Sequence, residues 1–468
     1  MRAWCLKMPD AALRELLAAA QIEAAGWPQI SGADPVLPTP YRIGTAGAAA
    51  LAALGVGAAR FGELRGLPAQ QVAVDLRAAA LSLRSARYLR IDGAPLPPVW
   101  DPLSGYYPVR DGWISIHCNF PNHRDAALKV LDSVPGRKQA EEKSGAWTGE
   151  ALEDAIHAAA GCAGFVRSAA DWERHAQAKA VAAQPLLEIT RIGDAPPESP
   201  KAAKRPLAGI RVLDLTRVLA GPTCGKSLAE HGADVLKISA AHLPDSGPVE
   251  LDTGIGKLSA RLDLRTAEGV YILKSLVKEA DVFSQSYRPG ALAARGFSPE
   301  ALAKLRPGIV YVSLSAWGES GPWHARRGFD SIVQAVSGMA QASGDGKMPK
   351  LMPVSAIDYV SGYLMAFGAT VALARRAREG GSWLVRVALA RVGRWITERG
   401  MLPLAALANL AADLPAAELE RYTAEMDAPA GRIRYLRPVV QLSHTPPYWS
   451  RPPVPLGTHP PAWPERGL

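Results

Sequence analysis

Residues 206–222 read Pro-Leu-Ala-Gly-Ile-Arg-Val-Leu-Asp-Leu-Thr-Arg-Val-Leu-Ala-Gly-Pro, and this stretch decides the fold of the chain. An apolar strand over 210–215 runs into a Gly-Pro loop, a short helix follows, and Gly232–Ile238 begins a second strand. A strand, a helix and a strand in this order open a doubly wound sheet, which binds nucleotide-like ligands at its strand ends. We therefore predict an α/β protein with a doubly wound parallel sheet and a smaller α+β domain.

Composition narrows the classes of partner. A chain of 468 residues with 48% apolar and 21% charged residues predicts a globular protein of more than one domain. The net charge of +9 is scattered without long basic runs, which argues against a nucleic-acid partner and fits an anionic small molecule. Cysteines are few and far apart, so we expect free buried thiols in a reducing cytoplasm; they are Cys5, Cys118, Cys162 and Cys224.

Three apolar segments could be either membrane-directed segments (a signal peptide or membrane spans) or helices of the folded protein. Residues 1–25 are interrupted by Asp10, Arg14 and Glu15, which predicts an amphipathic helix rather than a signal peptide. Ile43–Ala59 and Tyr359–Ala374 are rich in Ala and Gly, and too weakly apolar for a bilayer. We interpret both as buried helices and predict no membrane partner.

Pro- and Gly-rich junctions divide the chain. A helix–turn–strand pattern occurs in both halves, over 48–83 and 363–396, and a hairpin is predicted around Asp111-Gly112. Helices are expected near 125–131, 150–159 and 170–178. The predicted regions are an N-terminal helix and linker (1–38), a small α+β region (39–193), a linker (194–205), a Rossmann-like domain (206–398), and a helix with an extended Pro-rich tail (399–468).

One motif nearly matches a phosphate-binding loop. Residues 220–227 read Ala-Gly-Pro-Thr-Cys-Gly-Lys-Ser, but Ala220 stands where the first glycine is needed and Pro222 removes an amide donor. An NTPase therefore stays a remote alternative, and we expect Lys226 and Ser227 to lie on an ordinary helix. The Gly-x-Gly-x-x-Gly dinucleotide fingerprint is absent from the sequence.

Several sequence blocks together resemble the class III (CaiB/BaiF-type, formyl-CoA-transferase-like) CoA-transferases. The resemblance covers about 206–389, and more loosely 41–189, which such enzymes normally carry after the large domain. The small domain would then precede the large one, as in a permuted order. The blocks are Pro206–Pro222, Gly232–Lys237, Gly256-Lys257, Leu262–Arg265, Ala280–Val282, Tyr287–Gly290, Gly318–Pro322, Arg327–Asp330 and Val354–Gly362.

The resemblance implies an acyl-CoA:carboxylate CoA-transferase in which Asp358 is the covalent nucleophile. A carboxylate can attack an acyl-CoA thioester and later carry CoA as an aspartyl thioester. Asp358 precedes a helical stretch, whose amides we expect to stabilise the oxyanion; read alone, the residue is also typical of a helix N-cap. The family blocks suggest that CoA is bound by Arg217, Val218, Lys257, Arg265, Tyr287, Arg288 and Arg327.

The resemblance further implies acyl-CoA and a carboxylic acid as substrates, a homodimer, no tightly bound cofactor and no metal. His117-Cys118-Asn119 and His123 lack good ligand spacing for a metal, which favours structural or substrate-lining roles. Residues 100–107 are expected to line the acyl pocket.

Departures from the family pattern leave alternatives open. Ser239-Ala-Ala241 and His242 replace the usual adenosine-side residues, so a degenerate CoA-binding protein is one alternative. An acyl-CoA racemase or isomerase is another, although Phe329 stands where the racemases carry histidine. The first half has no acid between Asp34 and Glu63, so a duplicated nucleophile is not expected there.

Overall fold

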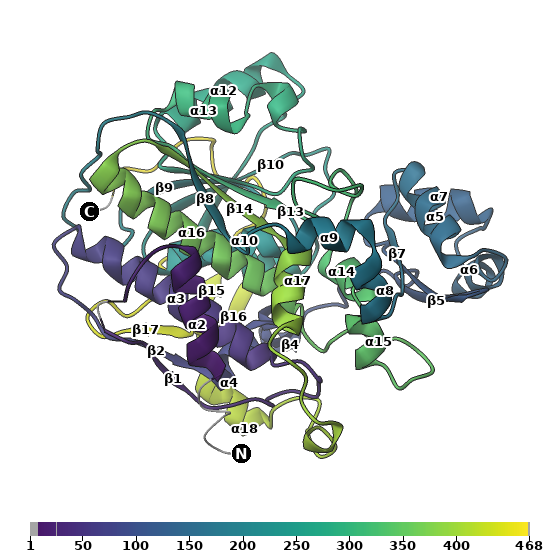
Figure 1. Cartoon of the computed structure of the whole chain (residues 1–468). Helices are drawn as coiled ribbons and strands as arrows, with labels where there is room; N and C mark the ends of the chain where they lie inside the picture. Colours follow the sequence, from purple (N-terminus) through teal and green to yellow (C-terminus); the bar gives the residue numbers. More distant parts are fainter. Residues whose placement is uncertain (1–7, 25, 467–468) are drawn as a thin grey trace.

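A seven-stranded sheet forms the centre of the computed structural model, which describes residues 8–24 and 26–466 (Figure 1). Across the sheet the strands are β11 (Lys257–Arg261), β10 (Asp234–Ser239), β9 (Arg211–Leu215), β12 (Val282–Gln285), β13 (Val310–Ser315), β14 (Ser382–Ala388) and β8 (Glu188–Gly193). All pairs are parallel except β14 with β8. Counted along the chain from β9, the parallel strands follow the order 3-2-1-4-5-6 of dinucleotide-binding sheets. The predicted largely parallel α/β sheet is confirmed.

Helices cover both faces of this sheet, because successive strand residues point to opposite sides. Val212 packs in the apolar cluster that contains α10 (Ala220–Glu230) and α16 (Ala356–Glu379). Leu213 packs in a second cluster with α12 (Ala267–Lys278) and α13 (Pro299–Leu305). α16 therefore runs buried along the sheet, and its first turn lies close to the strand ends.

A second, smaller unit packs beside α16. It contains β1 (Gln29–Ser31), α3 (Ile43–Glu63), β2 (Val72–Asp75), α4 (Leu76–Ser82) and β17 (Val440–Leu442). β1 pairs parallel to β2, and β17 pairs antiparallel to it. α3 lies against α16, and α2 (Met8–Ala19) covers α3 (Figure 1).

The two long apolar helices pass a length and composition test for membrane spans, but 94% of that window in α3 and 100% in α16 are buried inside the protein. The interpretation of both as core helices is confirmed. Of the expected N-terminal helix over 1–25, residues 1–7 and 25 lie outside the described residues.

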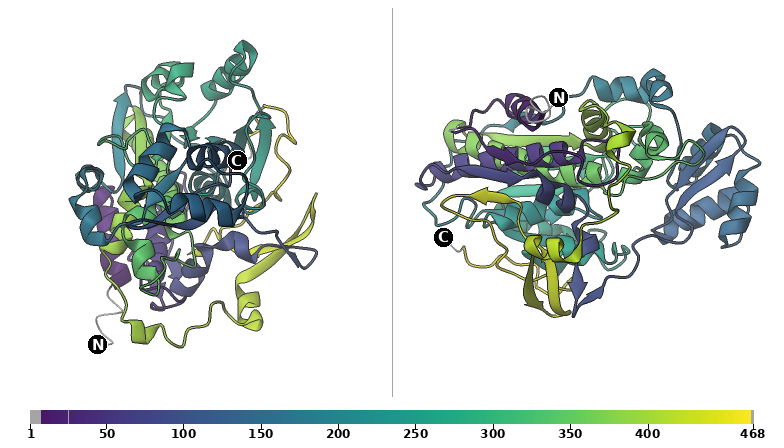
Figure 2. Two further views of the ribbon diagram at one scale, coloured as in Figure 1. Left: turned by 90° about the vertical axis from the view of Figure 1, so that its right-hand side faces the viewer. Right: turned by 90° about the horizontal axis from the view of Figure 1, so that it is seen from below.

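A separate lobe projects to one side of the large sheet (Figure 2). It has its own core, built from β5 (Gly105–Val109), β6 (Gly112–Ile116), β7 (Ala163–Phe165), α5 (Pro121–Leu131), α6 (Arg137–Ser144) and α7 (Gly149–Ala158). The hairpin predicted at Asp111-Gly112 is confirmed. Within the predicted region 39–193, only this later part forms the lobe, since α3 packs in the main body.

The helix predicted over 170–178 is wrong in one respect. The structure divides it into α8 (Ala169–Arg174) and α9 (Ala176–Ala182), because His175 is extended and its ring accepts a hydrogen bond from the amide of Gln177. A side chain that caps a new helix competes with continuation of the old one.

The predicted helical stretch after Gly400 is also wrong. Residues there form loops with η3 (Leu404–Ala406), α18 (Ala416–Leu419) and η4 (Glu420–Tyr422). Leu404 is 74% exposed, so its apolar side chain gains little from helix packing. A four-stranded sheet follows, ordered β15 (Thr423–Ala428), β16 (Gly431–Leu436), β3 (Arg90–Ile91) and β4 (Ala94–Pro95).

The Pro-rich tail over 445–464 contains no helix or strand, as predicted, and runs along the large sheet. The amide of Gly457 donates to Ser259 Oγ, and Trp463 donates to the carbonyl of Leu276. The remaining short helices are η1 (Ser85–Tyr88), α11 (Val249–Gly254), η2 (Ala293–Arg295), α14 (Asp330–Val336), α15 (Met339–Ser343) and α17 (Leu389–Thr397).

Candidate active site

Asp358 lies in the first turn of α16, where two cavities meet. Its side chain is buried, with 8% of the residue exposed, and it lines both cavities. Val218, Leu219, Phe120 and Phe329 are shared by the two cavities in the same way. A ligand with one arm in each cavity would therefore pass directly beside this carboxylate.

A second carboxylate holds the start of α16. Asp330, the first residue of α14, accepts hydrogen bonds from the amides of Ile357 (2.9 Å) and Asp358 (3.1 Å). Gln334, one turn later on α14, also donates to Asp330. The sequence led us to expect these helix-start amides as oxyanion donors; two of them already bind a carboxylate, which corrects that expectation.

The two carboxyl groups influence each other's ionisation. Burial raises the pKa of Asp358 well above its ordinary value, and the negative charge of Asp330 raises it further. Burial also raises the pKa of Asp330, although the amides that it accepts from oppose this shift. Asp358 is therefore a more basic carboxylate than a solvated one, and proton binding competes with its use as a nucleophile.

The first cavity, here called the basic cavity, has a volume of about 730 Å³. It lies over the carboxyl ends of β9, β12 and β13, the edge where doubly wound sheets bind ligands. Five of the seven residues predicted to bind CoA line it: Arg217, Val218, Tyr287, Arg288 and Arg327. Burial and the neighbouring Arg288 lower the pKa of Arg327, so an anion in this cavity would relieve repulsion between guanidinium groups.

Val218 has a backbone φ of 69°. This left-handed conformation is strained for a β-branched residue. The residue lies at the turn after β9 and faces both cavities. Strained backbone of this kind concentrates at functional sites.

The other two predicted residues lie elsewhere. Lys257 is 2% exposed, and its Nζ lies 2.7 Å from Asp214 Oδ2 and 2.7 Å from the carbonyl of Pro222; it does not line the basic cavity. Arg265 is exposed and pairs with Asp263 at 2.7 Å. Asp263 in turn lies 3.8 Å from His242, which does line the cavity, so Arg265 is near the rim.

The second cavity, here called the apolar cavity, has a volume of about 900 Å³. Much of its wall is apolar and comes from the segment before the lobe, from α11 and from the loop before α16, but Arg84, Arg87 and Arg90 also line it. The apolar lining residues include Pro95, Leu96, Pro97, Pro98, Val99, Trp100, Val249, Phe329, Leu351, Met352 and Val354. Of the predicted lining residues 100–107, Trp100 is in this wall.

An aromatic cluster lies between the two cavities. The ring of His117 stacks on Phe329 with centroids 3.9 Å apart and planes 6° apart. His123 meets the edge of the same Phe329 ring at 5.8 Å. His117 lines the apolar cavity and His123 the basic one. The lobe thus contributes one imidazole to each side of the site.

Both imidazoles are uncharged at neutral pH. Burial lowers the pKa of His117 to about 3, and burial together with Arg327 lowers the pKa of His123 to about 4. Among the residues that the structure describes, no group of three or more His, Cys, Asp or Glu is placed to hold a metal ion. The sequence suggested substrate-lining roles for this segment but not the stacking on Phe329, because that contact joins residues far apart in the chain.

The near-match to a phosphate-binding loop has a different structure. α10 begins at Ala220, and the amide of Thr223 already donates to the carbonyl of Leu219. Lys226 Nζ is buried 2.9 Å from Asp252 Oδ1. The prediction that Lys226 and Ser227 lie on an ordinary helix is confirmed.

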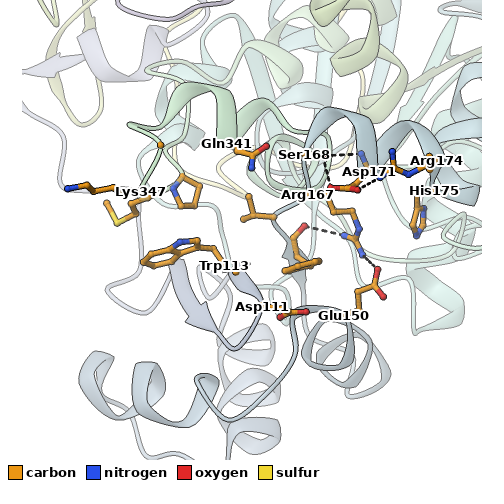
Figure 3. A pocket seen from close by; sticks show the side chains of 16 residues that line it. Asp111, Trp113, Glu150, Arg167, Ser168, Asp171, Arg174, His175, Gln341 and Lys347 are labelled. Atoms are coloured by element: carbon orange, nitrogen blue, oxygen red, sulfur yellow. Dashed lines mark hydrogen bonds and ion pairs between the residues drawn. The ribbon is translucent and has the colours of Figure 1, made fainter.

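A third cavity, of about 660 Å³, lies between the hairpin of the lobe, α8 and the loop after α15 (Figure 3). Several of its charged groups form ion pairs: Arg167 with Glu150 and Glu153, and Arg174 with Asp171. Asp358 does not line it. This cavity therefore lies apart from the carboxylate centre.

Comparison with known proteins supplies an independent result. A model described as CoA-transferase family III matches residues 16–198 and 207–406. The acetyl-coenzyme A transferase nodX of Hypoxylon pulicicidum is 34% identical over 207 residues, which are 43% of this chain and 35% of that protein. An acyl-CoA transferase of Gibberella moniliformis is 28% identical over 398 residues, 75% of this chain and 69% of that protein.

A solved structure also matches in part. The crystal structure of the hypothetical protein Rv3272 from Mycobacterium tuberculosis has a TM-score of 0.39 and 32% sequence identity, covering 42% of this chain and 58% of that chain. The present chain spans about a third of the length of the nodX protein and somewhat more than half of Rv3272.

Proposed function

Since the chain belongs to CoA-transferase family III, we propose that it transfers CoA from an acyl-CoA donor to a carboxylic acid, with Asp358 as covalent nucleophile. The observation that carries this proposal is the position of Asp358, a buried carboxylate at the junction of a basic and an apolar cavity. A CoA thioester matches this arrangement. Its CoA part carries the negatively charged phosphates that suit the basic cavity, its acyl group suits the apolar cavity, and the two parts are joined at the reactive thioester carbonyl.

The proposed reaction runs through two exchanges on Asp358. A carboxylate oxygen attacks the thioester carbonyl, and the carbon–sulfur bond breaks to give a mixed anhydride and CoA thiolate. The thiolate then attacks the aspartyl carbonyl and releases the donor acid, which leaves an aspartyl-CoA thioester. The acceptor carboxylate attacks that thioester and the two steps repeat in reverse order. Each step exchanges an anionic nucleophile for an anionic leaving group, so no proton has to be moved.

The basic cavity is the proposed binding place for CoA. Arg217, Arg288 and Arg327 line it and supply the guanidinium groups that phosphates prefer. Val218 and Tyr287 line the same cavity. His242 also lines it and follows directly on Ser239–Ala241, the segment that departs from the family pattern, so we propose that the adenosine end binds beside His242.

The acyl group and the acceptor acid are proposed to share the apolar cavity. A volume of about 900 Å³ is in the range of pockets that enclose whole drug-sized ligands. Donor and acceptor use it in turn, because both must present a carbonyl carbon or a carboxylate to the same Asp358.

We further propose that the protein forms a homodimer and works in the cytoplasm. The family resemblance supports a homodimer, and burial of the described thiols of Cys118, Cys162 and Cys224 supports a reducing compartment such as the cytoplasm. Gel filtration with light scattering measures the first of these directly.

Mass spectrometry tests the chemistry. Incubation of the protein with a panel of acyl-CoAs is expected to leave a CoA adduct on the peptide containing Asp358, and Asp358→Asn is expected to bind the same thioesters without forming it. CoA binding without an adduct in the wild type would indicate the degenerate CoA-binding alternative. Exchange of deuterium at C2 of the acyl group without CoA transfer would indicate the racemase or isomerase alternative.

A further inference from the structure

Gln334 is a buried amide in the wall of the apolar cavity, and both ends of its side chain are bound inside the protein. It belongs to α14, is 1% exposed and lines the cavity. Its Nε2 donates to Oδ1 of Asp330, and its Oε1 accepts a hydrogen bond from the amide of Met352 at 2.9 Å. A carboxylate can only accept and a backbone amide can only donate, so the two partners fix the orientation of the side-chain amide.

Gln334 completes the hydrogen bonding of the carboxylate that holds the start of α16. Oδ2 of Asp330 accepts from the amides of Ile357 and Asp358, while Oδ1 accepts from Gln334. Asp330 is 6% exposed, so water has little access to replace a lost donor, and a buried acceptor left without a donor is costly. Gln334 therefore helps to hold Asp330, and through it the first turn of α16, in one orientation.

The same side chain also holds the loop that leads into α16. This loop contributes Met352 and Val354 to the wall of the apolar cavity. The amide of Met352 donates to Gln334, and the amide of Ser355, directly before the helix, donates to the carbonyl of Leu83 at 3.0 Å. Gln334 thus joins the cavity wall to the carboxylate clamp, and a displacement of one would be transmitted to the other.

Gln334 also acts on the charge beside the nucleophile. Burial raises the pKa of Asp330 to about 6, and the hydrogen bond from Gln334 is the largest of the contacts that oppose this shift. Titratable neighbours of Asp330 are Asp358 on α16 and Tyr106 on β5; burial and the charge of Asp330 raise the pKa of both. A donor to the ionised carboxylate favours that form, which is the form that accepts all three hydrogen bonds.

We propose that Gln334 is a positioning residue for the transfer reaction, which holds Asp330 and Met352 together so that Asp358 faces an acyl group seated in the apolar cavity. This inference rests on the proposed CoA-transferase function and deepens it. Gln334 lines the apolar cavity but not the basic one, so its effect is expected on the chemical step and not on CoA binding. Displacing reacting groups by about 1 Å can slow a reaction about 100-fold.

Gln334→Met tests the proposal, because it removes both hydrogen bonds and keeps an unbranched side chain of similar length. The probe is acetyl-, butyryl- or succinyl-CoA, whichever reacts fastest with the wild type. At saturating thioester, the rate at which the Asp358 adduct forms is expected to fall about 100-fold. The Kd for CoA, measured by isothermal titration calorimetry, is expected to be unchanged. Circular dichroism shows whether the variant is folded.

Gln70→Met is the matched control, because Gln70 is also a buried glutamine bound to backbone groups. Its Oε1 accepts from the amides of His444 (3.1 Å) and Thr445 (2.9 Å), and it lines neither the apolar nor the basic cavity. This variant is expected to lower the denaturant midpoint of unfolding, as Gln334→Met does, and to keep the wild-type rate of adduct formation. Loss of buried hydrogen bonds alone would then not account for a slow Gln334→Met.

Gln334→Glu is a second test with a readout that a merely structural role would not change. The new carboxyl group can still accept from Met352, but it donates to Asp330 only while it holds a proton. Two adjacent buried carboxyl groups share one proton until the pH is high enough to remove it. The rate of adduct formation, divided by the wild-type rate at each pH, is therefore expected to be highest at low pH and to fall as the pH rises.

The failures are distinguishable. A folded Gln334→Met that forms the adduct at the wild-type rate would overturn the inference, and so would a loss of rate matched by an equal loss of CoA affinity. A relative rate of Gln334→Glu that does not change with pH would also overturn it, and this measurement decides alone if Gln334→Met does not fold. If none of the three thioesters forms an adduct with the wild type, the proposed function itself fails.

Discussion

The starts of α16 and α3 are built alike, yet only one of them holds a candidate nucleophile. At α16, Asp330 accepts the amides of Ile357 and Asp358. At α3, Asp34 accepts the amides of Gly44 (2.9 Å) and Thr45 (2.8 Å). Each helix thus begins on a carboxylate contributed by an earlier segment.

The likeness extends over the whole units. Without a gap, Gly55 and Val72 align with Gly368 and Val385, and this alignment places Thr45 at the position of Asp358. β1–α3–β2 corresponds to β13–α16–β14, parallel in both cases. Each unit is completed by an antiparallel strand from the other half of the chain: β17 joins β2, and β8 joins β14.

The contact between the helices fits the same relation. A Cβ atom on Gly57 would lie 2.1 Å from Oγ1 of Thr370, and Thr370 is the residue that aligns with Gly57. A contact between equivalent residues is what an approximate twofold axis between the two helix–strand units would produce, so the close approach of Gly57 and Thr370 fits such a relation.

The N-terminal ends of α16 and α3 differ in two respects: cavities lie beside the first but not beside the second, and the aligned side chains are Asp358 and Thr45. Neither Asp34 nor Thr45 lines any of the three cavities described above. A Cβ on Gly44 would lie 2.4 Å from Leu76, so that end is filled by α4. The carboxylate clamp is therefore part of the scaffold at both helices, whereas the proposed chemistry requires Asp358 and the cavities beside it.

Substitution of the two aligned residues gives the largest expected difference. Asp358→Asn is expected to lower the rate of CoA transfer at least about 10⁴-fold, as removal of a covalent nucleophile does. Thr45→Ala is expected to leave the rate nearly unchanged and to lower the free energy of unfolding by about 1 kcal/mol. Steady-state transfer assays and denaturant unfolding measure both. Equal loss of activity in the two variants would break the distinction.

The contact of Gly57 with Thr370 gives the next largest effect, on stability. Gly57→Val is expected to lower the free energy of unfolding by about 3 kcal/mol, because its side chain would displace Thr370 and separate α3 from α16. Thr370→Gly in the same chain is expected to recover part of the loss. Gly136→Val is the control, since nothing lies within 4 Å of a Cβ there. Tolerance of Gly57→Val equal to the control would contradict the close approach.

The N-terminal end of α16 also differs from that of α3 in the arginine side chains that line the basic cavity beside it. Arg327→Ala is expected to raise the Kd for CoA about 10-fold or more, because it removes a charged hydrogen-bond donor from the basic cavity. Arg265→Ala is the matched arginine outside the cavity and is expected to have a smaller effect. Isothermal titration calorimetry gives both constants. A larger effect at Arg265 would move the CoA site towards the rim.

The sequence predicted the features that are local to one segment. The apolar run over 210–215 and the second strand after Gly232 indicated the sheet, and the loops after its strands contained five of the cavity residues. The Gly-Pro pair expected in a loop before the helix lies instead inside α10 (Ala220–Glu230). Lys257 could not be placed in this way, because its partner Asp214 is on β9, across β10 from β11. The ammonium group is buried by that neighbour rather than by anything near it in sequence.

The site residues contributed by the lobe were only partly predicted for the same reason. Trp100 was expected in the acyl pocket from its position in the family order. The stacking of His117 on Phe329 and the clamp of Asp330 on α16 depend on how distant segments pack. The absence of an acid between Asp34 and Glu63 was visible in the sequence, and it becomes informative once Thr45 is seen on the same kind of clamp as Asp358.

The smallest expected effect is a shift in pH dependence, and it compares the two clamps directly. Burial and the charge of Asp330 raise the pKa of Asp358. Its carboxyl group must be ionised to act as the proposed nucleophile, so kcat/KM is expected to fall as the pH drops through that pKa. Asp330→Asn keeps an acceptor oxygen but removes the charge. It should lower the pKa of Asp358 and move the acid limb of the profile to lower pH.

Asp34→Asn makes the same change at the other helix and is expected to leave the acid limb in place. Burial raises the pKa of Asp34, Asp330 and Asp358, so these groups favour the folded state at low pH and lose that contribution as the pH rises through their folded pKa values. For Asp214 and Asp281 the nearby cations Lys257 and Arg376 outweigh burial and lower the pKa, so the stability that these two carboxylates contribute is lost as the pH falls. Profiles of kcat/KM against pH are therefore measured for both variants together with circular dichroism over the same range, and an equal shift of the acid limb in two folded variants would mean that the clamp at α3 is coupled to the site.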